Sequence, residues 1–378
     1  MWSRKHWRVC SPQSPLQFKE VNRMRKQSNM RGRRNIRTRL DLWIALLFLF
    51  AMPLCLAQKP SEKLPKPPGK SYGEQMGPYA TVLTEMTLYV QPDTTSTPVT
   101  VVEPGREMNI SEHNGPWLRV FANTDINQEP TDDQPEFGNT AKLPPASGWV
   151  QDRGVISAQT ANGDMVLFGA ASDAEHEASQ PHPPAHAAKN AQRLYQRVNE
   201  FFPKSPLAPE AAWRAADIQW QLDREDISTL PSAHEKASYL RPQINDSAMH
   251  KLEHKYPGSK WADLAAWDMI DNKLCGAWQG STDCPEREAA IYAKYAHEHP
   301  NSPKLQQALW ESAWRLAVLK IEYAQNSDAK RAKQAGERAT DMAQAIEQKF
   351  PNTDYAARAT TLIYKMNNSL PVFGEDHD

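Results

Sequence analysis

FFPKSPLAPEAAW (201–213) is the first of four copies of one short pattern, and the others are KYPGSKWADLAAW (255–267), EHPNSPKLQQALW (298–310) and KFPNTDYAARATT (349–361). Each copy has a proline after an amphipathic run and a serine or threonine two residues later. Proline cannot continue a helix, and a hydroxyl side chain caps the start of the next helix. Each copy therefore predicts a helix, a tight turn and a second helix. Repetition of such units is typical of stacked helical hairpins.

Small residues follow each proline at helical spacing, and they predict a face on which two helices approach closely. They are Ala208, Ala211, Ala262, Ala265, Ala308, Ala356 and Ala359. Three tryptophans, Trp213, Trp267 and Trp310, lie well round from that face. We take these tryptophans as candidates for lining a ligand groove. The alternative is that they pack between neighbouring repeats.

A tyrosine at a fixed distance before two of the prolines carries a resemblance to a known group of repeats. Tyr195 and Tyr292 stand eight residues before Pro203 and Pro300. The copies resemble the tetratricopeptide repeat (TPR) group, and most closely its periplasmic members with a Y-x7-[FY]-P-x-S signature. Those members include outer-membrane assembly lipoproteins and the coordinator protein of the Tol–Pal system. The resemblance covers residues 188–368 and implies an α-helical solenoid that binds proteins or peptides.

The front of the chain indicates the compartment of the protein. Residues 1–57 hold twelve Lys or Arg and two acidic side chains, and they end in the apolar run LWIALLFLFAMPLCLA (42–57). A basic segment followed by a short apolar core is typical of a secretory signal peptide. The alternative is an anchor that stays in the inner membrane through residues 42–57. A Pro- and Lys-rich linker (58–78) follows. We therefore expect a protein of the periplasm or cell envelope.

Charge and cysteine content change their meaning once this basic leader is set aside. The whole chain has a net charge of −1, so the residues after the leader are acidic overall. This argues against nucleic acid as a partner. Cys10 and Cys55 lie in the leader, and the remaining pair, Cys275 and Cys284, predicts a disulfide in an exported protein. The alternative is two reduced thiols. Two cysteines without a set of histidines are not a zinc pattern, and we expect no metal or cofactor.

Residues 79–157 alternate apolar and polar side chains between turn residues, which predicts the short strands of a small barrel. A Pro-Gly turn (104–105), a Trp-x-x-Val strand (117–120) and a Gly-Trp-Val ending (148–150) make this segment similar to the bacterial SH3 (SH3b) domain. An acidic insertion (125–146) separates the last strands. The resemblance implies that the segment binds cell-wall glycan or a peptide. Its candidate binding residues are Trp117 and Trp149.

The predicted fold class is therefore multidomain. A small all-β SH3-like barrel (79–157) is followed by a flexible linker (158–187), an α-helical TPR-like solenoid (188–368) and a short tail (369–378). The linker contains three histidines, which either catch a metal ion or are simply solvated. They are His176, His182 and His186.

The sequence contains no phosphate-binding loop of the GxxxxGK[ST] type and no His-Glu-x-x-His helix. We predict a non-catalytic scaffold or adaptor of the cell envelope, with no catalytic residues. Its helical repeats would bind protein or peptide partners, and its SH3-like module would bind peptidoglycan or a peptide. The alternative is a cell-wall hydrolase, or an activator of one, targeted by the SH3-like module. A hydrolase of this kind needs a nucleophilic cysteine beside a histidine.

Overall fold

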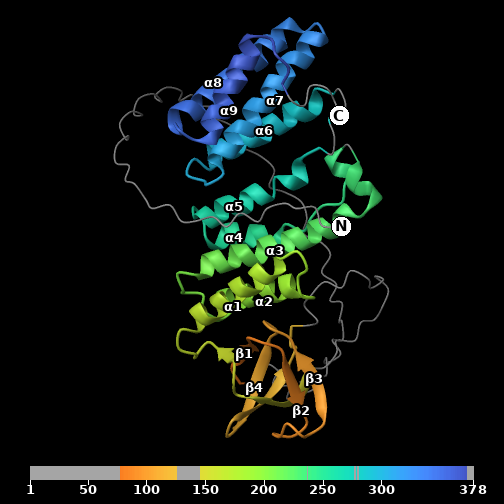
Figure 1. The fold of residues 1–378 in the computed structure, drawn as a ribbon, viewed down its shortest axis with the longest axis vertical. Coiled ribbons are helices and arrows are strands. Elements are labelled where there is room, and N and C mark those ends of the chain that lie inside the picture. The colour runs from red at the N-terminus through yellow and green to blue at the C-terminus, as the bar shows by residue number, and fades with distance from the viewer. Residues whose placement is uncertain (1–76, 126–144, 236, 276–277, 279–280, 373–378) are drawn as a thin grey trace, which may run out of the picture. The chain divides into compact units, whose positions relative to one another are not determined.

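The computed structural model describes residues 77–125, 145–235, 237–275, 278 and 281–372 (Figure 1). These residues belong to one compact unit, Gly73–Asp378. Several predictions fall on residues outside the described ones. They concern the signal peptide or anchor (1–57) with Cys10 and Cys55, the linker up to residue 76, most of the acidic insertion (126–144) and the tail from residue 373.

Seven strands form one antiparallel sheet in the N-terminal part of the described chain. The strand order is β3-β2-β6-β5-β4-β1-β7, so the first strand pairs with both the fourth and the last. The strands are β1 (Tyr79–Val82), β2 (Met86–Tyr89), β3 (Pro98–Val102), β4 (Met108–Asn114), β5 (Trp117–Ala122), β6 (Ala146–Gln151) and β7 (Val155–Ser157).

The sheet has one buried face because its strands alternate. In β5, Leu118, Val120 and Ala122 are buried, whereas Arg119 between them is exposed. This is the two-residue period of a half-buried strand. The strands therefore lie where the alternation predicts them. The core of the sheet also contains Ala80, Val82, Leu88, Val102, Met108, Ile110 and Val150.

Nine α-helices follow the sheet within the described residues. They are α1 (Gly163–Ala178), α2 (Ala187–Phe201), α3 (Ala208–Ser228), α4 (Ser247–Lys255), α5 (Lys260–Asp268), α6 (Asp283–Glu298), α7 (Leu305–Gln325), α8 (Ala329–Lys349) and α9 (Asp354–Asn367). Short 3₁₀ helices lie at Pro231–His234, Ser238–Leu240 and Asp271–Lys273.

The hydroxyl residues of the repeated pattern act in two different ways. Ser259 and Thr353 each accept a hydrogen bond from the backbone N–H three residues on, at 3.2 Å, and so cap α5 and α9 as predicted. In the other two copies, Ser205 and Ser302 accept from the N–H two residues on, at 3.1 and 3.0 Å. In these two copies a turn precedes the helix. Helices α3 and α7 therefore begin two residues after the proline that follows each serine, at Ala208 and Leu305.

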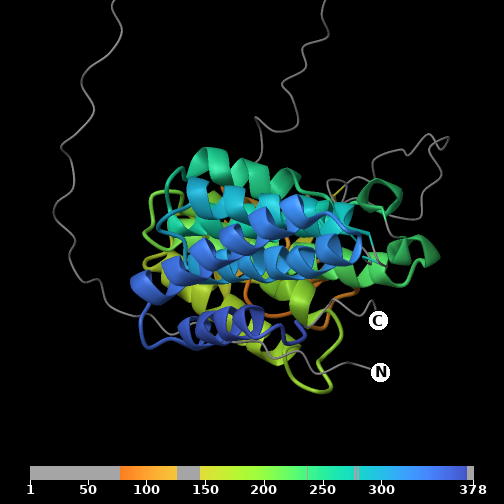
Figure 2. The ribbon, with the colours of Figure 1, turned by 90° about the horizontal axis from the view of Figure 1, so that it is seen from above.

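The helices pack against one another through small side chains. α2 packs on α3, α4 on α5, α6 on α7, and α8 on both α7 and α9. Seen from above, most of the helix axes run in similar directions (Figure 2). All of the alanines that the sequence places on the close-approach face are buried, which confirms that part of the prediction. They are Ala208, Ala211, Ala262, Ala265, Ala308, Ala356 and Ala359.

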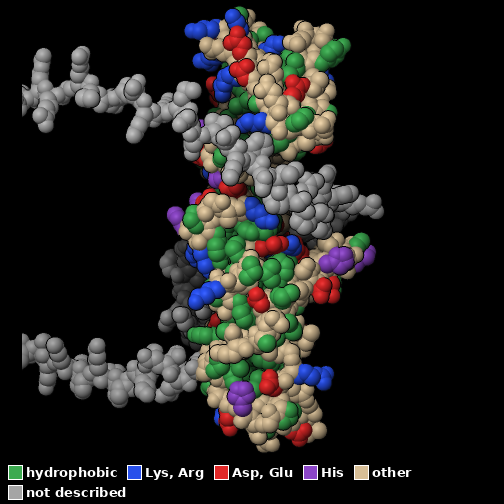
Figure 3. Space-filling view, turned by 90° about the vertical axis from the view of Figure 1, so that its left-hand side faces the viewer, with side chains coloured by type: hydrophobic (Ala, Val, Ile, Leu, Met, Phe, Trp, Pro, Cys, Tyr) green, Lys and Arg blue, Asp and Glu red, His purple; other side chains and the backbone are tan. Residues whose placement is uncertain are grey.

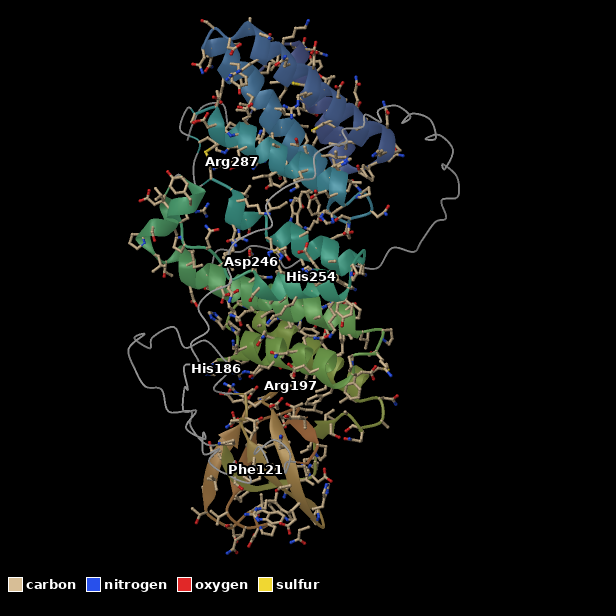
Figure 4. The ribbon with its side chains drawn as sticks, turned by 180° about the vertical axis from the view of Figure 1, so that it is seen from behind. Phe121, His186, Arg197, Asp246, His254 and Arg287 are labelled. Carbon is tan, nitrogen blue, oxygen red and sulfur yellow. A yellow bond between two sulfur atoms is a disulfide. The ribbon has the colours of Figure 1, made fainter. Side chains whose placement is uncertain are left out.

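Buried arginines join the sheet to α2. The Nε of Arg197 donates to the carbonyl oxygen of Gly105 at 2.8 Å, and its guanidinium also pairs with Asp125. Arg193, one turn earlier, pairs with Glu103 at 2.5 Å. Gly105 has φ of 77°, and a Cβ added to it would lie 2.5 Å from the Cβ of Arg193. Only glycine therefore lets this turn approach α2 so closely. Figure 4 labels Arg197 on the helix beside the sheet.

The predicted fold class, a small SH3-like barrel joined flexibly to a TPR-like solenoid, is wrong. The seven-stranded antiparallel sheet is larger than a small SH3 barrel, and with the helices it forms a mixed α/β unit. The sheet contacts the helices through charged side chains such as Arg193 and Arg197, and through Ile156 of β7, which is buried in one apolar cluster with residues of α1 and α2. A sequence pattern assigns arginines to solvent, so it did not predict that Arg193 and Arg197 are buried against the sheet.

The segment 158–187 contains helix α1 where the sequence predicts a linker. Leu167 and Ala171 of α1 are fully buried in a cluster with residues of α2. The ring of Phe168 meets that of Tyr195 edge to face, with 5.2 Å between their centroids. The histidines and prolines at 180–186 indicated a linker, but the alanine-rich run before them has high helix propensity.

Replacing Arg197 with methionine should lower the free energy of unfolding by about 3 kcal/mol, because breaking the buried ion pair leaves the carboxylate of Asp125 with only the more distant Arg106, at 3.7 Å. Lysine should recover only part of this loss, since one ammonium group does not present the planar fork of a guanidinium. Urea unfolding followed by circular dichroism measures both changes. Arg153→Met, at an exposed position, is the control and should change stability by less than about 0.5 kcal/mol. Equal losses at the two positions would contradict a stabilising role for the interface.

Candidate functional site

An open groove of about 450 Å³ lies between α7 and α9. One of the predicted binding residues, Trp310, lines it, and Trp314 follows one turn later on α7. The groove is mostly apolar at its base and charged along its rim. Its lining residues are Trp310, Glu311 and Trp314 of α7, Ala357, Arg358, Thr361, Leu362 and Lys365 of α9, and Val372.

The aromatic floor of the groove is held in place from below. The ring of Trp314 lies against that of Trp278, with 5.1 Å between centroids. The guanidinium carbon of Arg315 lies 4.9 Å from the Trp314 ring and 4.6 Å from the Tyr292 ring. Such cation–π contacts strengthen when they are desolvated, and Arg315 is buried. The floor is therefore fixed by packing before any ligand arrives.

The predicted disulfide between Cys275 and Cys284 is present, and it lies beside this support. The backbone N–H of Cys275 donates to the carboxylate of Glu288 at 2.8 Å. The other oxygen of Glu288 accepts from the Nε of Arg315 at 2.7 Å. The disulfide thus fixes the backbone N–H of Cys275, which binds Glu288. Glu288 in turn holds Arg315 under the groove.

Two cations on α9 form the rim of the groove. Arg358 is exposed, stacks over Tyr355 at 5.3 Å and pairs with Asp354 at 3.5 Å. The Nζ of Lys365 has no hydrogen-bond or ion-pair partner among the described residues. Neither cation stands out in the sequence, because scattered charges on a helix are usually only a solvated face.

Two other predicted tryptophans lie between helical hairpins. Trp213 stacks on Trp261, with 5.2 Å between ring centroids, and its Nε1 donates to Asp268 at 3.3 Å. Trp267 lies 5.6 Å from the ring of Tyr292. These half-buried rings join successive hairpins and do not line the α7–α9 groove.

A pair of carboxylates lies beside these rings. Burial raises the pKa of Asp217 on α3 to about 6. Burial, reinforced by the charge of Asp217, raises the pKa of Asp268 to about 8. The side-chain N–H groups of Gln221 and Trp213 donate to the two carboxylates at 2.8 and 3.3 Å, and the cation of Lys304 opposes both shifts. The pair therefore keeps a proton near neutral pH.

The remaining predicted residues, Trp117 and Trp149, lie on the outer face of the sheet. The rings of Tyr89 and Trp117 meet edge to face at 6.0 Å. Trp149 stands directly opposite Tyr89 on one side and Arg119 on the other. Both tryptophans are half-buried and point away from the sheet core. Phe121, labelled in Figure 4, continues this face along β5.

A repeated pentapeptide could have located the support of the groove. EAAWR (210–214) and ESAWR (311–315) share a glutamate, a tryptophan and an arginine at the same spacing. In each, the arginine pairs with the glutamate four residues earlier. Arg214 also lies over the ring of Tyr195, just as Arg315 lies over the tyrosine of its own hairpin. When the copies are aligned on their prolines, Trp213 is matched with Trp310. The pentapeptides instead match Trp213 with Trp314, so the alignment on prolines hides this repetition.

The described surface shows neither a metal-binding cluster nor a patch of one charge on the face drawn in Figure 3. No group of three or more His, Cys, Asp or Glu is placed to hold a metal ion in the part of the chain that the structure describes. No helix within that part is long and apolar enough to cross a membrane. Acidic, basic and hydrophobic side chains are interspersed on the face drawn in Figure 3.

Comparison with known proteins does not place the chain in a family. No family model matches it, and no curated protein matches it. Among solved structures, a chain named "DHF79 filament" is similar over 53% of this chain and 96% of its own length, with 14% sequence identity and a TM-score of 0.19. A similarity at that TM-score says nothing about fold or function here.

The carboxylate pair should make the protein less stable as the pH rises from about 4 to about 8. Unfolded aspartates release their protons near pH 4, whereas the folded pair releases them later, so the unfolded state gains relative stability across this window. Asp268→Asn should therefore raise the free energy of unfolding at pH 8 by more than about 1 kcal/mol, with no gain near pH 4. Asp226→Asn, at an exposed position of α3, should show no such dependence. Thermal or urea unfolding at several pH values measures the difference, and a gain of equal size at pH 4 would rule out protonation as its cause.

Proposed function

We propose that the protein is a non-catalytic scaffold or adaptor of the cell envelope that binds protein or peptide partners through its helices. The groove between α7 and α9 carries this proposal. Its floor holds Trp310 and Trp314 and its rim is charged. Aromatic residues surrounded by a polar rim are typical of protein-binding surfaces. A preformed groove also lowers the entropy lost on binding.

A second ligand is part of the same proposal. The outer face of the sheet, with Tyr89, Trp117 and Trp149, would bind peptidoglycan or a peptide of the cell wall. Two ligand sites on one chain increase each other's occupancy when both ligands lie in the same layer. The basic and apolar leader supports export, with cleavage giving a periplasmic protein and retention an inner-membrane anchor.

Two further observations support a binding role in the envelope. A disulfide between Cys275 and Cys284 suits an oxidising compartment. The bridged cysteines hold no free thiolate, which counts against a cysteine-dependent wall hydrolase.

Filling the groove should abolish capture of the partner. We expect intact protein to retain a specific set of proteins from envelope extracts, and Ala357→Trp to lose them, because Ala357 lines the groove and is exposed. Ala324→Trp is the matched control at an exposed position of α7, and it should retain them. Quantitative mass spectrometry of the captured proteins measures the difference. Release of soluble wall fragments by the purified protein would instead establish a hydrolase and overturn the scaffold.

A further inference from the structure

We propose that the groove between α7 and α9 binds an acidic amphipathic helix of a partner protein. The apolar side chains of that helix would contact Trp310 and Trp314, and its carboxylates would reach Arg358 and Lys365. This inference rests on the proposed binding function and adds the chemical class of the partner.

The floor of the groove has the spacing of a helix. Trp310 and Trp314 are four residues apart on α7, so they lie on one face and one turn apart. A ligand helix presents its own apolar side chains at the same interval, which is how amphipathic helices bind grooves. A volume of about 450 Å³ accepts several inserted side chains while the backbone of the ligand lies above them.

The rim of the groove supplies the matching charge. Arg358, Thr361, Leu362 and Lys365 follow the i, i+3, i+4, i+7 pattern, so they form one stripe along α9. The two cations are two turns apart, about 10.5 Å along the axis. Carboxylates seven residues apart on a ligand helix have the same separation.

The rim of the groove on α9 carries two positive charges, Arg358 and Lys365. Lys365 has no charged partner among the described residues. Arg358 has only an exposed partner, Asp354 at 3.5 Å, and such surface pairs are weak. The acidic side chain in the lining, Glu311, lies on α7 and not on the rim, and it pairs at 2.6 Å with Arg315, which also holds Glu288. A ligand that places carboxylates against α9 therefore complements this rim better than a neutral or basic one.

The test uses the full chain and a fluorescein-labelled peptide of about 18 residues, a length at which an alanine-rich helix becomes stable. The peptide carries leucines four residues apart on one face and glutamates seven residues apart beside them. A matched peptide has glutamine in place of each glutamate. Fluorescence anisotropy should show the acidic peptide binding roughly tenfold more tightly at low salt. The difference should shrink at about 1 M salt, where exposed charges are screened.

Charge reversal on α9 provides the decisive variant. The double change Arg358→Glu and Lys365→Glu should weaken the acidic peptide at least tenfold and favour a peptide with lysine in place of glutamate. Lys333→Glu with Arg338→Glu, at exposed positions of α8, is the control and should change affinity less than twofold. Circular dichroism checks that each variant is folded. Equal affinity for the acidic and glutamine peptides, or equal losses in both double variants, would overturn the assignment.

Two outcomes separate this inference from the proposed function. If the glutamine peptide binds as well as the acidic one and Ala357→Trp blocks both, the groove binds peptides but the acidic class is wrong. If no peptide is affected by Ala357→Trp, the groove itself is excluded as the binding site. The chain continues beyond Val372 with Phe373, Glu375, Asp376 and Asp378, which have the same chemistry as the probe. If the acidic peptide binds only to a variant that ends at Val372, the residues after Val372 are the occupant of the groove. That result would overturn the assignment of the groove to a partner protein.

Discussion

The guanidinium of Arg197 is the constraint on which the arrangement of sheet and helices depends. It is only 3% exposed, and besides Glu200 on its own helix it binds the carbonyl of Gly105 and the carboxylate of Asp125 on the sheet side. A buried charge that loses its acceptors is strongly destabilising, so α2 and the sheet fit together in one way. Gly105 completes the constraint, because a side chain there would collide with Arg193. This explains why sheet and helices form one unit.

The same device recurs between the helices. Arg214 and Arg315 each lie over a tyrosine of the preceding helix and pair with carboxylates on two helices. A planar guanidinium can stack on a ring and donate several hydrogen bonds in its own plane, which lysine cannot do. Alanine-rich helix faces bury little area per residue, so these contacts add both stability and orientation. One consequence is a groove floor that needs no rearrangement to receive a ligand.

Raised pKa values do not by themselves indicate catalysis in this protein. Asp217 and Asp268 keep a proton near neutral pH because they are buried close to each other and beside tryptophans. Perturbed pKa values are common at active sites, but packed polar networks between helices produce them as well. The groove lies elsewhere, between α7 and α9, and the residues that line it suit recognition more than proton transfer. The carboxylate pair and the groove are therefore separate features of the helical part of the chain.

The sequence by itself determined the local elements. Proline followed by a hydroxyl residue placed the helix boundaries of the hairpins, alanine spacing identified their buried faces, and alternation located the strands. Two cysteines outside the basic N-terminal segment sufficed to predict the disulfide. The tertiary structure alone decided that β1 pairs with β7, that a histidine-rich segment begins as helix α1, and that Trp310 faces Lys365 across a groove. Local periodicity reports how a residue relates to its neighbours on one helix or strand. Contacts between residues far apart in the chain depend on shape and on charged partners, which leave no periodic trace.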